Sequence, residues 1–183
     1  MNMIRSGSIL IANPHLDDPN FIHTVVFLCE HSQEGSFGFV LNRPTTYTID
    51  ELVPELSHYK IPVFEGGPVE LNTLHFLHQY PDLIPGSKEV MNGVYWGGSF
   101  NELITHIRKR AVDIDKIRFY LGYSGWDAGQ LDAEMDEKAW ISSYATHQLL
   151  FGTDYNDIWK SALKSCGKEY EMFINAPIDP RLN

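Results

Sequence analysis

The sequence lacks paired cysteines and long apolar runs. Its two cysteines, Cys29 and Cys166, lie far apart and form no C-x-x-C motif, and Cys29 falls inside an apolar strand pattern, where a free thiol behaves as a small hydrophobic side chain. No uninterrupted apolar run approaches the roughly 20 residues that span a bilayer, and the N-terminal residues lack the apolar core of a signal peptide. We therefore expect a protein of the reducing cytoplasm with no membrane partner.

Basic residues are also scarce. The chain has 14 lysines and arginines against 24 aspartates and glutamates, which gives a formal net charge of -10. Nucleic-acid affinity comes largely from the neutralisation of phosphates by Lys and Arg, so this balance disfavours direct nucleic-acid binding. One basic cluster, residues 108–110, falls at the end of a predicted helix, where cations stabilise the helix dipole.

The motifs of common metal, nucleotide and phosphate sites are absent from the sequence. It contains no H-E-x-x-H, no pair of C-x-x-C motifs, no G-x-G-x-x-G fingerprint and no Gly-Lys-Ser/Thr after a glycine-rich loop. His75 and His78 are three residues apart, but on a strand that spacing directs their rings to opposite faces of the sheet. We expect neither a metal nor a cofactor.

The sequence does contain enough apolar material for one folded domain. Apolar residues make up 43% of its 183 residues, and this length suits a single domain over residues 1–183. The sequence shows no internal repeat of 20–50 residues and no low-complexity segment. Many short strands with three or four helices that do not strictly alternate favour an α+β fold over a doubly wound sheet.

Apolar patterning and turn residues predict the individual elements. The expected strands cover residues 8–12, 22–30, 37–41, 61–64, 71–78, 94–96, 117–121 and 140–144. The second of these is expected to be buried on both faces and to form a hairpin with the third. Helices are expected after the capping-box residues Thr48 and Ser99, over residues 131–135 and over residues 154–164. Residues 176–183 are expected to form a loose tail.

The most distinctive stretch is residues 122–134, with the sequence GYSGWDAGQLDAE. Its three glycines within eight residues indicate a backbone that takes positive φ or closely approaches another segment, and we interpret the stretch as a turn from strand to helix. It partly matches the nucleophile elbow G-x-S-x-G, but Trp126 stands where that motif has its last glycine. Ser124 is therefore interpreted as a turn residue and not as a nucleophile.

Two other glycine-rich turns and one arginine are candidate binding elements. Residues 97–99 precede a predicted helix, whose free amides would attract an anion, and residues 66–68 form a second tight turn. Both are interpreted first as structural turns. Arg43 can hold a carboxylate or phosphate through two hydrogen bonds, or it can pair with one of the many acidic residues.

Together these motifs resemble those of the AlgH/YqgE family of small bacterial proteins, whose biochemical function is unassigned. The motifs that carry the resemblance are, in chain order, Asn13-Pro14, Asp18-Pro19 with Phe21, Glu30-His31, residues 38–44 (GFVLNRP), residues 66–69 (GGPV), residues 122–126 (GYSGW), residues 129–131 (GQL), Glu134 and Trp140. Their order and spacing, from about Gly7 to Trp159, make the match specific. One departure is Ser124, where many members of the family are expected to have Ala.

The resemblance implies a fold and a compartment. The expected fold is a single α+β domain with a bifurcated, partly barrel-like mixed β-sheet flanked by three or four helices, in a bacterial cytoplasmic protein. Members of the family have been labelled transcriptional regulators. Nothing in these residues supports that label, because the sequence shows no helix-turn-helix pattern and its acidic charge opposes DNA.

The leading hypothesis is a non-enzymatic protein that binds a ligand or a protein partner and has a regulatory role. The surface predicted for this binding comprises Asn42, Arg43, Gly66, Gly67, Tyr123, Trp126 and Gln130. These residues combine turn glycines, aromatic rings and hydrogen-bonding groups. They include no complete catalytic set, so no catalytic residue is assigned.

The alternative is a hydrolase or transferase that acts on a phosphorylated or nucleotide-like substrate. In that hypothesis Arg43 and the amides of residues 97–99 hold the anion, and Asp127 or Glu134 acts as general base. A third hypothesis is regulation at DNA through a partner protein.

Overall fold

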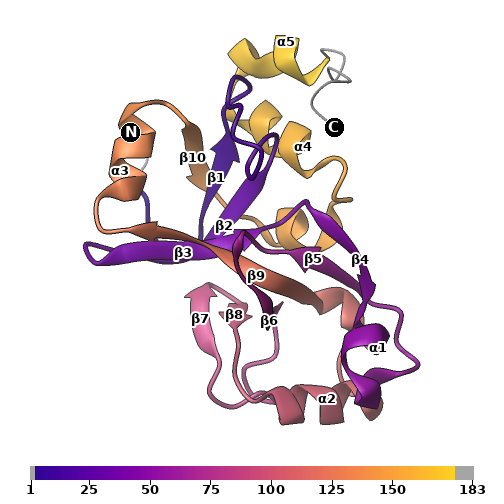
Figure 1. The fold of residues 1–183 in the computed structure, drawn as a ribbon. Coiled ribbons are helices and arrows are strands. Elements are labelled where there is room, and N and C mark those ends of the chain that lie inside the picture. The colour runs from indigo at the N-terminus through magenta and orange to yellow at the C-terminus, as the bar shows by residue number, and fades with distance from the viewer. Residues whose placement is uncertain (1–2, 176–183) are drawn as a thin grey trace.

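A computed structural model describes residues 3–175, in which ten strands form one sheet (Figure 1). The strands are β1 Ser8–Ala12, β2 Val25–Ser32, β3 Gly35–Val40, β4 Pro44–Thr48, β5 Pro62–Glu65, β6 Val69–His78, β7 Lys88–Met91, β8 Val94–Trp96, β9 Ile117–Asp127 and β10 Trp140–Tyr144. The α-helices are α1 Ile49–Leu52, α2 Phe100–Arg108, α3 Gln130–Asp136, α4 Ile158–Cys166 and α5 Glu171–Ile174. Short helical turns cover Pro54–Leu56, Ile114–Lys116, Gln148–Gly152 and Lys168–Tyr170. The tail predicted at residues 176–183 lies outside the described residues.

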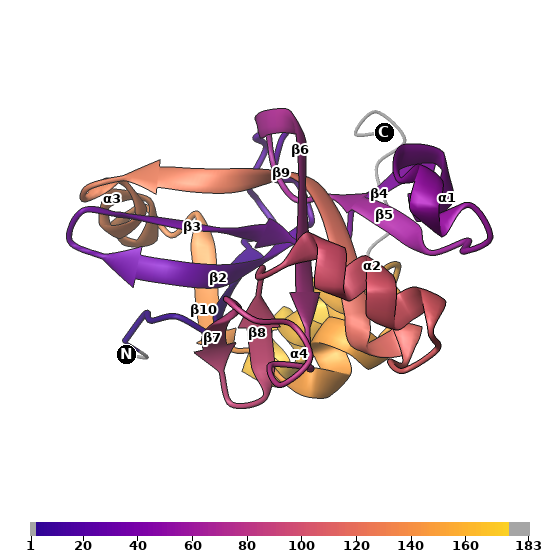
Figure 2. The same ribbon diagram turned by 90° about the horizontal axis from the view of Figure 1, so that it is seen from below.

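The sheet curls on itself and forks at β9. Its hydrogen-bonded order is β10-β1-β2-β3-β9-β6-β8-β7, and β5 pairs with β9 as a branch that also carries β4. The last strand in this order, β7, comes back beside β2, where Lys88 of β7 forms an ion pair with Glu30 of β2. In Figure 2, β2, β3 and β9 extend together toward α3, while β4 and β5 leave on the other side beside α1. The predicted α+β class and the bifurcated, partly barrel-like sheet are confirmed.

Strand β2 is buried on both faces, as its continuous apolar run predicts. Val25 and Phe27 pack into a core that includes residues of α4, whereas Val26 and Leu28 pack on the opposite face with Leu131 of α3. The predicted hairpin between β2 and β3 is also confirmed by their antiparallel pairing. A sheet that is covered on both faces in this way has no solvent-facing side at its centre.

The helices begin where local capping signals predict. The Thr48 capping box is formed, with the backbone amide of Thr48 donating to Glu51 Oε2 over 2.8 Å, and α1 ends after one turn before Pro54. The Ser99 hydroxyl accepts a hydrogen bond from the Glu102 amide at the start of α2. α1 and α2 cover a third core, which includes Phe76, Leu103 and Phe119. None of the helices in residues 3–175 has the length and apolar character needed to cross a membrane.

The sheet forks because the chain crosses over β9 between β5 and β6. β5 and β6 both pair with Phe119–Leu121 of β9, so they lie along its two opposite edges. The short link through Gly66 and Gly67 therefore passes across β9 at Gly122, and a Cβ atom built on Gly67 would lie 2.2 Å from the backbone of Tyr123. A Cβ on Gly122, whose φ is +69°, would lie 2.7 Å from the carbonyl oxygen of Gly67. Only glycine allows two backbones to approach this closely.

Several predicted boundaries differ from the structure. β9 continues from Ile117 to Asp127, so the interpretation of residues 122–127 as a turn is wrong, and the turn is confined to Ala128 and Gly129. The reason is that residues 124–127 pair with β3 beyond the crossing. β4 and β7 were not predicted, because both are short and largely exposed and lack an apolar face. β2 and α4 begin three and four residues later than predicted, at Val25 and Ile158.

The two histidines of β6 point to opposite faces, as their spacing predicts. His75 packs against Phe39 and Tyr123, while His78 is fully buried beside Phe76. The Tyr80 amide donates to His78 Nδ1 over 3.0 Å, so the proton must lie on Nε2, which is 2.9 Å from the Gly97 carbonyl oxygen. Burial lowers the pKa of His78 despite the bond to that carbonyl.

We predict that Gly122→Ala destabilises the protein far more than Gly129→Ala. Both glycines have positive φ, +69° and +76°, so both substitutions carry a conformational cost of about 1–2 kcal/mol. A Cβ at Gly129 meets no atom within 4 Å, whereas at Gly122 it clashes with the crossing chain. Urea unfolding should give a loss of at least about 3 kcal/mol for Gly122→Ala and about 1 kcal/mol for Gly129→Ala. Equal losses of unfolding free energy in the two variants would show that the close backbone contact at Gly122 is not what requires glycine there.

We also predict that the free energy of unfolding decreases as the pH falls from 7.5 to 5.5. Burial lowers the pKa of His23, His75 and His78 in the folded state, so the unfolded chain takes up protons more readily at these sites. The resulting stability is complete above the unfolded pKa of about 6.5 and is lost below it. Urea unfolding at several pH values should show a flatter dependence for His78→Gln than for the exposed control His58→Gln. A stability that is constant or rises toward pH 5.5 would contradict this assignment.

Candidate functional site

Asn42, the first residue of the predicted binding surface, fixes the start of β2 through its side-chain amide. Its Oδ1 accepts a hydrogen bond from the Val25 amide over 3.0 Å, and its Nδ2 donates to the His23 carbonyl over 2.8 Å. Both ends of the amide are therefore engaged within the fold. The side chain ties the end of β3 to the start of β2.

Arg43 lies beside Asn42 and is held by main-chain carbonyls. Its Nη1 donates to the Asn20 carbonyl and its Nη2 to the Pro19 carbonyl over 3.4 Å. Nη1 also lies 3.9 Å from Glu65 Oε1, a distance at which the ion pair is weak. Of the two alternatives for Arg43, pairing with an acidic residue is present among residues 3–175 only as this weak contact with Glu65, and the binding of a carboxylate or phosphate ligand stays a prediction.

Gly66, Gly67 and Tyr123 lie together at the crossing over β9. The Gly66 carbonyl accepts hydrogen bonds from the Val40 amide over 2.8 Å and from the buried Ser124 hydroxyl over 3.0 Å. Tyr123 is partly buried against the central core. Ser124 is thus a structural donor, which agrees with its interpretation as a residue other than a nucleophile.

Trp126 and Gln130 meet at a third place, around Glu134 of α3. Glu134 Oε2 accepts hydrogen bonds from the indole nitrogens of Trp126 and Trp140 over 2.9 and 2.8 Å, and Oε1 accepts from Gln130 Nε2 over 3.1 Å. Gln130 Oε1 in turn accepts from the Asp127 amide. This carboxylate connects α3, β9 and β10, and its occupied oxygens make it a poor general base.

The predicted surface therefore falls into three places in the fold, and none of its residues lines the cavities described below. In the enzymatic alternative, the amides of residues 97–99 bind the anion, but two of these amides already donate to carbonyl groups of the protein. The Gly97 amide donates to the Phe76 carbonyl and the Ser99 amide to the Pro85 carbonyl, which leaves fewer amides for a phosphate. The role of the predicted surface in binding a ligand or partner stays a prediction.

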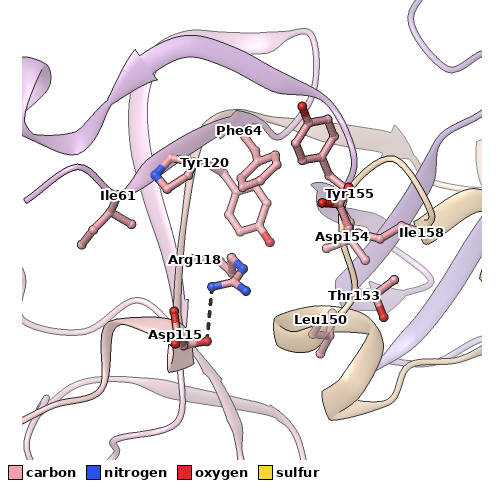
Figure 3. A pocket seen from close by; sticks show the side chains of 12 residues that line it. Ile61, Phe64, Asp115, Arg118, Tyr120, Leu150, Thr153, Asp154, Tyr155 and Ile158 are labelled. Carbon is pink, nitrogen blue, oxygen red and sulfur yellow. Dashed lines mark hydrogen bonds between the residues drawn. The ribbon is translucent and has the colours of Figure 1, made fainter.

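A different cavity brings charged and aromatic groups together. It has a volume of about 240 Å³ and lies between β5 and β9 on one side and the segment 150–158 on the other (Figure 3). We call it the Arg118 pocket. It is lined by Leu41, Ile61, Pro62, Phe64, Asp115, Arg118, Tyr120, Leu150, Thr153, Asp154, Tyr155 and Ile158.

Arg118 is a fixed cation in this pocket. Its Nη1 donates to the carbonyls of Asp115 and Ile117 over 3.2 and 2.9 Å, and its Nη2 donates to the Phe151 carbonyl. The guanidinium carbon also lies 5.7 Å from the centre of the Phe151 ring. Within residues 3–175 no carboxylate oxygen lies within 4 Å of its nitrogens, so its charge has no internal counter-ion there. Nε and one N–H of Nη2 have no bonding partner among those residues.

Tyr120 places a hydroxyl beside this cation. Residues 118 and 120 lie on the same face of β9, and Figure 3 shows both side chains directed into the pocket. The Tyr120 ring is 1% exposed and stacks on Phe39 at 4.9 Å between centres. Its hydroxyl forms no hydrogen bond with any residue from 3 to 175. Burial raises the pKa of Tyr120 well above its ordinary value, so the hydroxyl is a neutral donor.

Sequence reasoning overlooked both residues. Arg118 and Tyr120 stand in the apolar run 117–121, which predicts a buried strand and draws attention away from its polar members. The period-two alternation of that strand was the available signal, since it places the two side chains on one face. The facing wall, residues 150–158, comes from a π-helical turn and loop, and no sequence pattern indicates that this segment lies opposite β9.

Two other cavities are more open. One of about 770 Å³ lies beside the C-terminal end of α2 and is lined by Arg108 and Arg110, and one of about 360 Å³ lies beside His15 and Lys138. Every residue that lines either cavity is at least partly exposed. Among these three cavities, only the Arg118 pocket receives the polar end of a buried residue, Tyr120.

Comparison with known proteins places the chain among bacterial relatives. The profile of the AlgH-like family matches residues 9–171. A protein of Chlorobium luteolum described as UPF0301 is 42% identical over 180 residues, which are 98% of this chain and 95% of the relative. A UPF0301 protein of Cytophaga hutchinsonii is 40% identical over 182 residues, with 99% and 100% of the two chains covered.

Solved structures show the same fold. The solution structure of the AlgH protein from Pseudomonas aeruginosa is 28% identical, with a TM-score of 0.73 over 98% of this chain and 100% of that one. A crystal structure of a Corynebacterium diphtheriae protein has a TM-score of 0.79 over 96% and 94% of the two chains, and its 16% identity supports a likeness of fold alone. The resemblance drawn from the sequence motifs is confirmed.

We predict that Glu134→Gln destabilises the fold without local unfolding of β9. The change keeps the shape of the side chain but removes the charge that strengthens hydrogen bonds from Trp126, Trp140 and Gln130, and it replaces one of the two acceptor oxygens by an amide nitrogen that cannot accept. The expected loss is about 2 kcal/mol in urea unfolding followed by tryptophan fluorescence. The exposed control Glu137→Gln should stay within about 0.5 kcal/mol of the unmodified protein. Equal stability of the two variants would contradict the structural role of Glu134.

Proposed function

Because this chain belongs to the AlgH-like family, whose biochemical function is unassigned, we propose its function from the chemistry of its own pocket. The protein is a non-enzymatic binding protein, and it takes a small organic carboxylate into the Arg118 pocket. The observation that carries the proposal is a cation with no counter-ion among residues 3–175 next to a hydroxyl with no hydrogen bond to those residues: the Arg118 guanidinium and the Tyr120 hydroxyl open into one cavity.

The charge of Arg118 favours an anionic ligand. The three carbonyl groups that hold the guanidinium are neutral, so they fix its position but leave its charge uncompensated. A carboxylate in the pocket would accept charge-assisted hydrogen bonds, which are about twice as strong as neutral ones. Because the guanidinium is already held in place, little side-chain entropy would be lost on binding.

The hydroxyl of Tyr120 supplies the second donor. The hydroxyl opens into the cavity and has no hydrogen-bond partner among residues 3–175, so a carboxylate oxygen beside Arg118 could accept its hydrogen bond. Burial keeps the phenol protonated, so it can donate and cannot repel an anion. One carboxylate with two oxygens can therefore satisfy both groups.

The size and walls of the pocket favour an organic molecule of modest size. Its volume of about 240 Å³ falls below the roughly 300–1,000 Å³ of sites for drug-sized ligands. Ile61, Phe64, Leu150 and Ile158 provide apolar walls next to the polar groups. An inorganic anion would leave these walls without contact.

Binding is favoured over catalysis by the side chains of the pocket. No serine, cysteine, histidine or lysine lines it. The hydroxyl of Thr153 donates to the Gln148 carbonyl over 3.0 Å, so it is used within the fold. A nucleophile with an adjacent base is therefore missing from the lining.

The proposal includes a bacterial cytoplasmic setting and a regulatory consequence of binding. The two cysteines are free, with Cys29 buried and Cys166 partly buried, and this usage suits a reducing compartment. The relatives named above come from bacteria. The net charge of -10 argues against direct contact with DNA, so any effect on transcription would need a partner protein.

The test uses 3-phenylpropanoate as a probe and pairs two tyrosine variants. Tyr120→Phe removes a hydroxyl without an internal acceptor, so it should lower the affinity about tenfold while leaving thermal stability unchanged or higher. Tyr59→Phe removes a hydroxyl that donates to the Ile107 carbonyl over 3.1 Å, outside the pocket. It should lower stability and leave the affinity unchanged.

Binding is measured by titration of amide resonances, with an expected dissociation constant of about a millimolar or below. Shifts should gather at β5, β9 and residues 150–158. The proposal is wrong if 3-phenylpropanoate, benzoate and acetate cause no saturable shift there, or if Tyr120→Phe binds as the unmodified protein does.

A further inference from the structure

We infer that the ligand of the Arg118 pocket is a zwitterion, a free α-amino acid with an apolar side chain. This inference rests on the proposed function and adds the position of a second charge. It follows from a carboxylate, Asp154, that faces Arg118 across the pocket (Figure 3).

A simple monoanion satisfies only part of the pocket. The lining contains one cation, Arg118, and two carboxylates, Asp115 and Asp154. An anion placed on Arg118 alone would lie in a cavity with two negative groups and gain no contact from them. A ligand with one negative and one positive group matches the charges on both walls.

Asp154 is the carboxylate placed to receive the positive group. Its Oδ1 accepts a hydrogen bond from the Asn156 amide over 2.9 Å, which holds the side chain in the turn before α4. No Lys, Arg or His nitrogen in residues 3–175 lies within 4 Å of its oxygens. The second oxygen is therefore available to an ammonium group from the ligand.

Asp115 is less suited to this role. It lies three residues before Arg118, and its carbonyl accepts a hydrogen bond from the guanidinium, so it belongs to the wall that binds the carboxylate. In Figure 3 it lies on the other side of Arg118 from Asp154. In an α-amino acid the ammonium and the carboxylate are bonded to the same carbon and diverge from it, so an ammonium that points away from Arg118 would face Asp154.

The remaining walls select the side chain of the amino acid. Phe64 and Tyr155 lie 6.0 Å apart between ring centres at 66°, an edge arrangement that leaves ring surface toward the pocket. Leu150 and Ile158 complete the apolar side of the cavity. A charged or strongly polar side chain would lose hydration there without gaining a partner.

The test compares three molecules that share one carbon skeleton. L-Phenylalanine carries both charges, 3-phenylpropanoate lacks the ammonium and 2-phenylethylamine lacks the carboxylate. We expect L-phenylalanine to bind at least about tenfold more tightly than either analogue. L-Glutamate, with a charged side chain, should bind at least about tenfold more weakly than L-phenylalanine.

Two aspartate variants locate the second charge. Asp154→Asn keeps an oxygen for the Asn156 amide, so the turn is retained, but it removes the charge. It should bring the affinity for L-phenylalanine to within about threefold of that for 3-phenylpropanoate. The exposed control Asp136→Asn, on α3, should leave the preference for L-phenylalanine intact.

The outcomes separate this inference from the proposed function. If 3-phenylpropanoate binds in a Tyr120-dependent manner and at least as tightly as L-phenylalanine, the zwitterion is excluded and carboxylate binding stands. A preference for L-phenylalanine that survives Asp154→Asn overturns the role of Asp154. If neither carboxylate binds, the proposed function fails and the inference fails with it.

Discussion

The rest of the structure depends on the close contact of two backbones at Gly67 and Gly122. Because β5 and β6 use opposite edges of the same part of β9, the chain between them must cross β9, and no side chain fits between the crossing segments. The crossing ends the pairing of β5 with β9 at Leu121 and lets β3 take the same edge from Ser124 onward. The fork of the sheet is the direct result, and the buried Ser124 hydroxyl reinforces it through the Gly66 carbonyl.

Strand β9 also contributes residues to all three hydrophobic cores. Tyr120 packs in the central core, Phe119 packs under α1 and α2, and Trp126 packs beneath α3. A strand that is fixed on both faces and both edges cannot rotate or slide without disturbing all three cores. Arg118 and Tyr120 inherit this rigidity, because they alternate with the buried Phe119 on the same strand. The fork also separates β5 from β3, and the pocket lies where residues 150–158 face the branch.

The parts of the fold that could be predicted from sequence are those with local causes. The caps at Thr48 and Ser99 and the two-sided burial of β2 each follow from residues within one turn or one strand. The length of β9 could not be predicted, since it depends on β3 pairing beyond the crossing. The pocket was missed for the same reason: Arg118 and Tyr120 share a face by simple alternation, but their opposing wall comes from a distant π-helical turn.

The packing of Tyr120 would also suit it to the proposed ligand. Its ring is fixed by stacking on Phe39, while its hydroxyl opens into the pocket. The hydroxyl is therefore held at a fixed point, as is the guanidinium of Arg118 by its three carbonyls. The proposed ligand would meet donors that need no ordering, and little of its binding energy would be spent on fixing them.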